Sequence, residues 1–222
     1  MSETPSPIAP LPEERLAHRL AATPTPRRSA LAKGLQELAA VDRAIYRVIA
    51  ETPTPTLDEP LRRLSGLANN SGLWLSIAAG LFLVGGERGR RAALTGVTAI
   101  GVNSAVVNLP MKFASRRTRP DREGAGVPSQ RWVTMPTSTS FPSGHSASAF
   151  AFAAAAGGEV PALAVPLRAL AASVAYSRVH TGVHYPGDVV VGSMIGTTIG
   201  EIIGRTARSV RRRRARRRDA GI

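Results

Sequence analysis

The fold of this 222-residue chain is decided by residues 141–158, which read FPSGHSASAFAFAAAAGG. From Ser146 onward this stretch is uncharged and rich in alanine, with Phe150 and Phe152 as its large side chains. Alanine is the strongest helix former, and small side chains let neighbouring helices approach closely. We therefore expect a helix that begins near Ser143 and packs tightly within a helical bundle.

Four apolar segments of similar length surround this stretch along the chain, at residues 71–86, 92–110, 160–177 and 189–204. The charged or amide side chains inside these segments are Asn103, Asn108, Arg168 and Glu201. Each segment is short against the ~20 residues that a membrane-spanning helix needs. A soluble helical bundle is therefore the alternative to a bundle of five membrane spans.

The placement of arginine favours the membrane. Arg88, Arg90 and Arg91 separate the first two apolar segments, Arg168 lies near the turn between the third and fourth, and an arginine-rich tail follows the fifth. If the five segments cross alternately, all three places fall on one side, which is the positive-inside pattern. We predict an all-α, membrane-embedded helical bundle of about five spans in the cell membrane, with its C-terminal tail in the cytoplasm.

The regions outside the bundle differ in character. Residues 1–28 are rich in Pro, Thr, Ser and charge and are predicted to be disordered. Residues 29–50 and 57–68 carry apolar side chains at helical spacing, so 29–69 is expected to form amphipathic helices at the membrane interface. The remaining boundaries are a transmembrane domain over 70–204 and an arginine-rich tail over 205–222.

The chain carries a net charge of +14, and nine of its arginines lie between Arg205 and Arg218. Directly after an apolar segment, such a tail is typical of an anchor on anionic lipids. A solvated tail and a nucleic-acid-binding tail are the alternatives, the last being the least favoured. The oligomeric state is not indicated.

Composition also limits the available chemistry. The chain has no cysteine, which excludes disulfides and thiolate metal sites. Its four histidines are scattered, so no metal site and no cofactor are expected. Polar chemistry is instead concentrated in three clusters, which are Lys112 with Arg119-Pro120, then Pro142-Ser143-Gly144-His145, and then Ser177-Arg178 with His184 and Asp188.

These clusters resemble the motifs K-x6-R-P, P-S-G-H and S-R-x5-H-x3-D of the type 2 phosphatidic acid phosphatase superfamily. That family includes membrane lipid phosphatases, bacterial acid phosphatases and vanadium haloperoxidases. All motif positions match in order and spacing, and the resemblance covers about residues 70–204. Membrane members of the family commonly have six spans, whereas this sequence indicates five. Alternating spans would bring the three clusters together on the extracytoplasmic face, opposite the arginine tail.

The resemblance implies roles for these residues in metal-independent phosphoryl transfer. Non-bridging phosphate oxygens would be bound by Lys112, Arg119, Arg178, the Ser143 hydroxyl and the Gly144 N–H at a helix N-terminus. His184 would be the nucleophile that forms a phosphohistidine, and Asp188, four residues later and expected on the same helix face, would orient it. His145 would protonate the leaving oxygen and then activate water.

The implied function is a lipid phosphatase acting on a terminal phosphomonoester or diphosphate. Candidate substrates are phosphatidic acid, phosphatidylglycerophosphate, polyprenyl phosphates and phosphorylated prenyl-linked sugars, with the small residues of 146–158 as one place for a lipid chain. A vanadium-dependent haloperoxidase-like enzyme and a non-catalytic, basic-tailed membrane scaffold are the alternatives.

Other polar residues receive weaker assignments. His180 is expected to support the site or lie at its rim, and His18 receives no role. Arg116 and Arg117 are expected either to contact the lipid headgroup or to be solvated.

Overall fold

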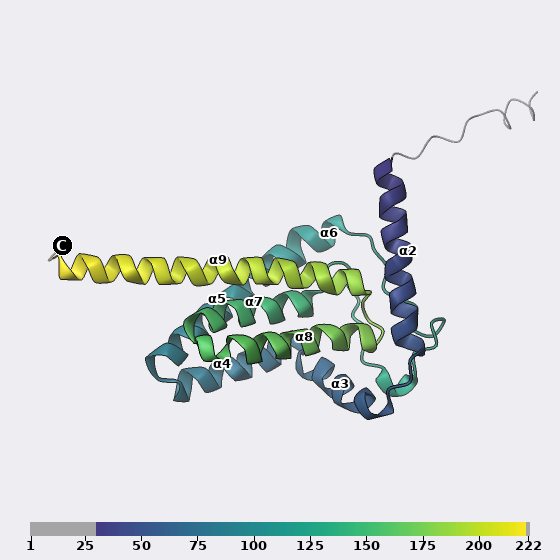
Figure 1. Cartoon of the computed structure of the whole chain (residues 1–222), viewed down its shortest axis with the longest axis horizontal. Coiled ribbons are helices and arrows are strands. Elements are labelled where there is room, and N and C mark those ends of the chain that lie inside the picture. The colour runs from purple at the N-terminus through teal and green to yellow at the C-terminus, as the bar shows by residue number, and fades with distance from the viewer. Residues whose placement is uncertain (1–29, 221–222) are drawn as a thin grey trace, which may run out of the picture. The chain divides into compact units, whose positions relative to one another are not determined.

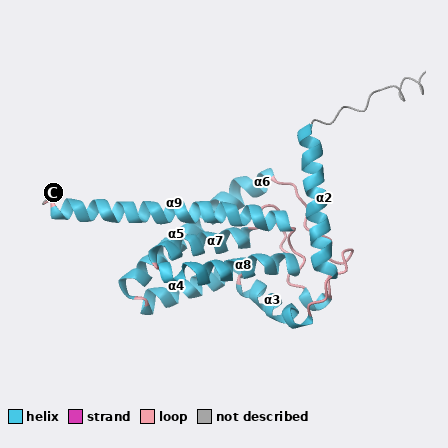
Figure 2. Ribbon diagram, viewed as in Figure 1, coloured by secondary structure: helices cyan, strands magenta, loops and turns pink. Residues whose placement is uncertain are grey.

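The computed structural model describes residues 30–220, and all regular secondary structure among these residues is helical, with no strand. The principal helices are α2 (Ala30–Glu51), α3 (Pro55–Leu67), α4 (Gly72–Val84), α5 (Gly86–Val106), α6 (Lys112–Ala114), α7 (Gly144–Glu159), α8 (Ala164–His180) and α9 (Pro186–Asp219), shown in Figures 1 and 2. The all-α prediction is thereby confirmed for the described residues. The predicted disorder of 1–28 and His18 lie outside them.

Contacts divide the chain into one unit that ends at Ala40 and a second unit from Val41 to Ile222. The bundle and the polar clusters belong to the second unit. Of the first unit, the structure describes the beginning of α2, whose Leu35 and Leu38 are exposed. The two predicted amphipathic segments do form helices, α2 and α3, and their place at a membrane interface stays a prediction.

The alanine-rich helix α7 lies at the centre of the second unit, in contact with α5, α8 and α9. Apart from the half-buried Phe150, every residue from Ser146 to Gly157 is buried. Phe152 packs against Trp74 of α4, with ring centroids 5.5 Å apart. Because α7 is surrounded by α5, α8 and α9, most of the small residues of 146–158 serve helix packing, and their use as a place for a lipid chain stays a prediction.

The contact between α7 and α9 depends on glycines at every fourth position of α9. Gly192, Gly196, Gly200 and Gly204 are all buried. A Cβ added to Gly192 would lie 2.5 Å from the carbonyl oxygen of Ser143, and one added to Gly196 would collide with the carbonyl oxygen of Ala147. The two helix backbones can approach this closely because small residues line the seam.

Two helix boundaries differ from the sequence-based expectation. Helix α5 begins at Gly86, so Arg88, Arg90 and Arg91 lie in its first turns rather than in a loop before it. Gly86 has a φ of +58°, which allows the sharp turn directly after α4. Helix α9 continues without a break through the arginine-rich segment to Asp219.

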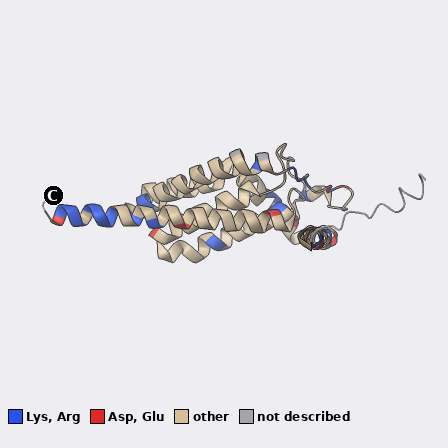
Figure 3. Cartoon of the chain, turned by 90° about the horizontal axis from the view of Figure 1, so that it is seen from above, with Lys and Arg blue, Asp and Glu red and all other residues tan. Residues whose placement is uncertain are grey.

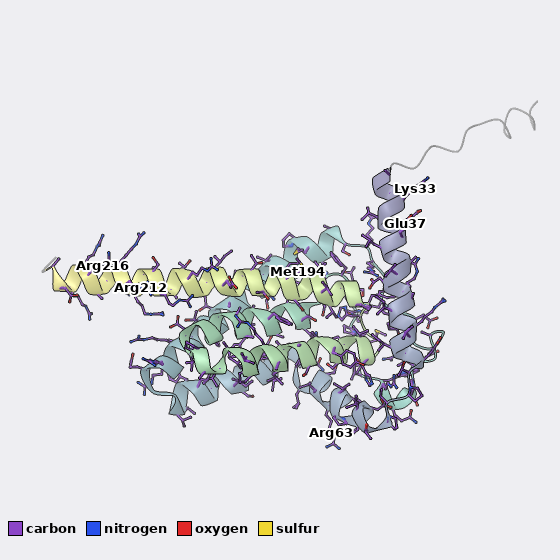
Figure 4. The ribbon with its side chains drawn as sticks, in the orientation of Figure 1. Lys33, Glu37, Arg63, Met194, Arg212 and Arg216 are labelled. Atoms are coloured by element: carbon purple, nitrogen blue, oxygen red, sulfur yellow. The ribbon has the colours of Figure 1, made fainter. Side chains whose placement is uncertain are left out.

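The tail is therefore helical over its described part. Figure 3 shows its basic residues concentrated toward the C-terminal end of this helix. Its beginning is tied to the bundle, because Arg208 and Arg211 pair with the nearly buried carboxylate of Glu159 on α7. In Figure 4, Arg212 and Arg216 lie further along α9, toward its C-terminal end.

Taken singly, none of the described helices is both long enough and apolar enough to qualify as a membrane span. The pair formed by Pro55–Leu67 and Asn69–Val84, bent by 65°, does qualify when its two parts are counted together.

Candidate active site

The three polar clusters meet at one end of the bundle because helices end and begin there. A π-helical turn (Val107–Met111) widens the end of α5 just before Lys112, and Ser143 is the N-cap of α7. Arg178 lies in the last turn of α8, and His184 lies in the short connection to α9. The backbone N–H of Ser143 donates to the Asp188 carbonyl (3.0 Å), which joins the second cluster to the third.

The connection after α8 folds back so that His184 lies over Arg178. The backbone N–H groups of Val183 and His184 donate to the carbonyl oxygen of Arg178 at 3.1 and 3.2 Å. Gly182 makes this reversal possible with a φ of +72°, and a Cβ there would lie 2.9 Å from Cβ of Arg122. The five-residue spacing between Arg178 and His184 is therefore the length of this turn.

The contacts of the His184 ring determine which nitrogen carries its proton. Nη1 of Arg119 lies 3.1 Å from Nε2 of His184. A guanidinium can donate hydrogen bonds but cannot accept them, so Nε2 must hold the lone pair. The proton then sits on Nδ1, which faces Oδ2 of Asp188 at 3.5 Å.

The expectation that His184 and Asp188 share a helix face was wrong. Helix α9 begins at Pro186, so Asp188 lies in its first turn and His184 precedes it. The two side chains still meet because the Asp188 carboxylate turns back over the helix start, where Oδ2 accepts the Tyr185 N–H at 2.9 Å.

Burial controls the charge of His184. The side chain is 2% exposed, and this burial lowers the pKa of His184 to about 4. The hydrogen bond with Asp188 raises that pKa, and the nearby charges of Arg119 and Arg178 lower it further. His184 is therefore neutral at pH 7, with an unprotonated Nε2 available for attack on phosphorus.

Asp188 is held by partners that the motif spacing did not reveal. Its side chain is fully buried and accepts hydrogen bonds from the Ser140 hydroxyl and from Nη1 of Arg117, the latter at 2.9 Å. Arg117 thus supports the site, and the expectation that it contacts a headgroup or solvent was wrong.

Arg178 is the most deeply buried cation of the cluster. It is 1% exposed, and its Nη1 donates to the carbonyl oxygen (3.2 Å) and hydroxyl of Ser65. Its Nε and Nη2 are buried with no hydrogen-bond partner among the described residues. Unpaired donors on a buried cation are costly unless an anion binds them.

The other two cations are positioned by the loop before α7. Arg119 donates to the carbonyl oxygens of Ser138 (2.9 Å) and Val183 (2.7 Å), and Nζ of Lys112 donates to the Ser138 hydroxyl (3.1 Å). Burial lowers the pKa of Lys112 and of Arg119. Several desolvated cations in one place create a strongly anion-attracting site.

His145 lies in the first turn of α7, directly after Gly144. Its Nε2 is 2.9 Å from Oδ1 of Asn69, a partner that the sequence did not indicate. Ser143 caps the same helix, where its hydroxyl contacts the Ser146 hydroxyl at 2.9 Å. The N-terminus of α7 therefore adds partial positive charge at this end of the bundle.

His180 lies elsewhere than expected. It is buried in a separate cluster, where Nε2 contacts the Thr54 hydroxyl (2.9 Å) and Asp58 (3.1 Å). Asp58 also pairs with the fully buried Arg131. This cluster ties α3 to the end of α8, so His180 is not at the rim of the site. Within residues 30–220, no group of three or more His, Asp or Glu side chains is arranged to hold a metal ion.

A helical bundle with a cationic pocket around a neutral histidine defines a class of protein that binds and transfers phosphate. Residues 92–211 match the family model of the PAP2 superfamily, and the chain belongs to that superfamily. All three motifs lie within the matched residues, and the family resemblance seen in the sequence is confirmed.

The chain is similar to two mycobacterial phosphatases of the same name. The chain is 38% identical over 125 residues to the decaprenylphosphoryl-5-phosphoribose phosphatase of Mycobacterium tuberculosis, covering 56% of this chain and 66% of the relative, just under two thirds. The protein of the same name from Mycolicibacterium smegmatis is 36% identical over 135 residues, covering 59% of this chain and 68% of the relative.

Solved structures share the fold. A transmembrane PAP2-type phosphatidylglycerolphosphate phosphatase from Bacillus subtilis aligns with a TM-score of 0.58 and 23% identity, over 80% of this chain and 87% of that one. LpxE of Aquifex aeolicus aligns with a TM-score of 0.59 and 26% identity, over 73% and 94%.

Proposed function

We propose that this chain is an integral membrane phosphatase that hydrolyses a terminal phosphomonoester, or a diphosphate, of a polyprenyl-type lipid or a phospholipid. The observation that most directly supports this proposal is a cluster of two cations around His184. Arg119 contacts Nε2 of His184, and the buried Arg178 has two N–H donors without a hydrogen-bond partner among the described residues. The names of the mycobacterial relatives favour a polyprenyl-linked substrate.

In the first step, Nε2 of His184 forms a bond to phosphorus while the bond between phosphorus and the ester oxygen breaks. Arg119, Arg178 and Lys112 neutralise the phosphate oxygens, and Asp188 stabilises the imidazolium that forms. His145 passes a proton to the leaving oxygen. This proton enters with the substrate phosphate in its monoanionic form.

In the second step, His145 removes a proton from water, and the resulting hydroxide attacks phosphorus. The bond between phosphorus and nitrogen breaks, which restores neutral His184 and releases phosphate. Phosphoryl transfer requires mainly positioning and charge neutralisation, and three permanent cations supply both. We therefore infer that the reaction needs no metal ion.

The proposed topology places the site on the extracytoplasmic side of the cell membrane, with α4, α5, α7, α8 and α9 as spans. The arginines at the start of α5 and in the tail lie at the opposite end of the bundle from His184, which supports this orientation. A 34-residue helix such as α9 is about 51 Å long, against a hydrocarbon core of about 30 Å. Its arginine-rich end would therefore reach the anionic lipid headgroups of the cytoplasmic leaflet.

The activity is tested by a phosphate-release screen of the purified full chain in nanodiscs. The substrates are phosphatidic acid, phosphatidylglycerophosphate, a polyprenyl phosphate and a polyprenyl-linked sugar phosphate, each assayed with excess EDTA and with His184→Ala as the blank. We expect release in EDTA from at least one substrate and none from the variant. Release from no substrate, or release by the variant, would overturn the proposal.

Vanadate separates the haloperoxidase alternative from the phosphatase. A phosphatase of this kind is inhibited competitively by vanadate and, when hydrogen peroxide is supplied as the oxidant, oxidises no halide in the presence of vanadate. Halide oxidation by hydrogen peroxide that depends on vanadate, without phosphate release, would favour the alternative.

The proposed topology is tested by labelling single cysteines, because the chain contains none of its own. Arg116→Cys, near the site, is expected to react with an impermeant maleimide in intact cells. Arg213→Cys, in the tail, should react only after permeabilisation. The opposite pattern would place the site on the cytoplasmic face.

A further inference from the structure

A cavity of about 440 Å³ adjoins the proposed active site on the side of His145. Besides His145 and Lys112, it is lined by polar side chains from two parts of the chain. Asn103 and Ser104 come from α5, and Asn70 and Ser71 come from the turn before α4. Its volume falls within the range of small-molecule binding sites. Its lining of amides and hydroxyls is suited to a ligand with many hydrogen-bonding groups.

Asn103 is the most informative residue of this lining. It is 0% exposed, inside a helix that is otherwise largely apolar at this end. Its Nδ2 donates to the Ser148 hydroxyl at 3.3 Å, and its Oδ1 has no hydrogen-bond partner among the described residues. A buried amide with an unused acceptor is unfavourable for folding alone, and a ligand hydroxyl in the cavity would satisfy it.

The position of the cavity relative to the chemistry limits what it can bind. His145 gives its proton to the leaving oxygen, so the alcohol that departs must lie on the His145 side of the phosphate. Ser148 lies one helical turn after His145 on the same face of α7, and both residues line the cavity. The alcohol half of the substrate is therefore the part that meets Asn103 and Ser148.

We propose that this cavity is the leaving-group subsite and that it binds a polyhydroxylated alcohol of the sugar type. Asn103 accepts a hydrogen bond from a sugar hydroxyl through Oδ1, and Ser104 and Ser148 offer further hydroxyl partners. The assignment rests on the proposed phosphatase function, and it selects sugar phosphates over glyceride and simple prenyl phosphates.

The test compares two soluble esters of primary alcohols, ribose 5-phosphate and n-butyl phosphate, with the purified full chain. The measured quantity is the ratio of their kcat/KM values, or the ratio of their inhibition constants against a lipid phosphate if neither ester is turned over. We expect the wild-type chain to favour ribose 5-phosphate by about tenfold or more, since each hydroxyl contact contributes severalfold. A wild-type ratio near one would overturn the subsite.

Asn103→Leu is expected to reduce that preference about tenfold, and the smaller change Ser148→Ala to reduce it about threefold. Thr95→Val is the matched control, because Thr95 is a buried polar residue on the same helix whose hydroxyl bonds the Arg91 carbonyl outside the cavity. An unchanged preference in both cavity variants would overturn the proposal, even if their absolute rates fell. Absence of phosphate release from every ester and lipid by the wild-type chain would instead overturn the phosphatase function.

Discussion

Nη1 of Arg117 lies 2.9 Å from Oδ1 of Asp188, and Nη2 of the same guanidinium pairs with Asp42 of α2. Asp42 also accepts the backbone N–H of Gly187, in the first turn of α9, at 2.7 Å. The guanidinium further stacks over the ring of Tyr185, 4.4 Å from its centroid. One arginine therefore links the C-terminal half of α2 to the carboxylate that orients His184.

Arg117→Gln is expected to lower kcat by about tenfold with little change in KM, because it removes a partner of Asp188 without touching the phosphate. Steady-state kinetics on the best lipid phosphate would measure this split. Arg116→Gln, a change at the exposed neighbouring residue, is the matched control and should leave kcat within about twofold. A change confined to KM would contradict the positioning role.

His145→Ala is expected to accumulate the phosphohistidine, since it removes the base that activates water in the second step. A substrate with a good leaving group needs little proton donation, so p-nitrophenyl phosphate should still load His184. Acid-labile, base-stable ³²P labelling of the protein would report the intermediate. The double variant His145→Ala with His184→Ala should carry no label, and label in that variant would place the nucleophile elsewhere.

The pH dependence follows from the lowered pKa of His184 and from the charge of the substrate phosphate. Attack requires unprotonated His184, so kcat/KM should fall below pH about 4. In the proposed reaction, the proton that reaches the leaving oxygen comes from the phosphate monoanion, which is lost above pH about 6. A bell-shaped profile with its maximum between these limits is expected, and a maximum above pH 8 would contradict it.

The same shift in His184 has a consequence for stability. The unfolded chain binds a proton at this histidine near pH 6.5, whereas the folded chain does so only near pH 4. Stability from this group is therefore present above pH about 6.5 and decreases as the pH falls toward 4. Thermal unfolding of wild type and His184→Ala across this range should show a smaller loss in the variant.

Gly196→Ala is expected to destabilise the protein by at least about 1–3 kcal/mol and to lower activity, because its Cβ would collide with the Ala147 carbonyl and force α7 away from α9. Gly101→Ala is the control, since a Cβ there meets nothing within 4 Å and should stabilise α5 by up to about 1 kcal/mol. Equal melting temperatures for the two variants would contradict the close packing of α7 against α9.

The five apolar bundle helices, α4, α5, α7, α8 and α9, were predictable because each depends on local composition and periodicity. The boundaries of these helices were less predictable. Helix α5 begins as early as Gly86, and α9 continues through a charged segment. The ion pair between Arg211 of α9 and Glu159 of α7 helps to hold that segment. The repeat of glycine at every fourth position of α9 was a usable signal for the seam with α7.

Within the site, the motif residues were predictable and their supporting partners were not. Ser140, Arg117 and Asn69 belong to no recognisable pattern, and they act because separate loops converge on the helix ends. Arg117 is one of the six residues between Lys112 and Arg119. The first motif does not specify the identity of these residues or the direction of their side chains.

By itself, the sequence determined the chemical inventory, which is three cations, two imidazoles and a carboxylate on a bundle of small-residue helices. Only the tertiary structure decided which nitrogen of His184 is unprotonated, what holds Asp188, and that Asn103 borders a polar cavity. The reason is physical: residue type and spacing are local properties, whereas a hydrogen bond between Arg119 and His184 exists only where two distant segments are brought within about 3 Å.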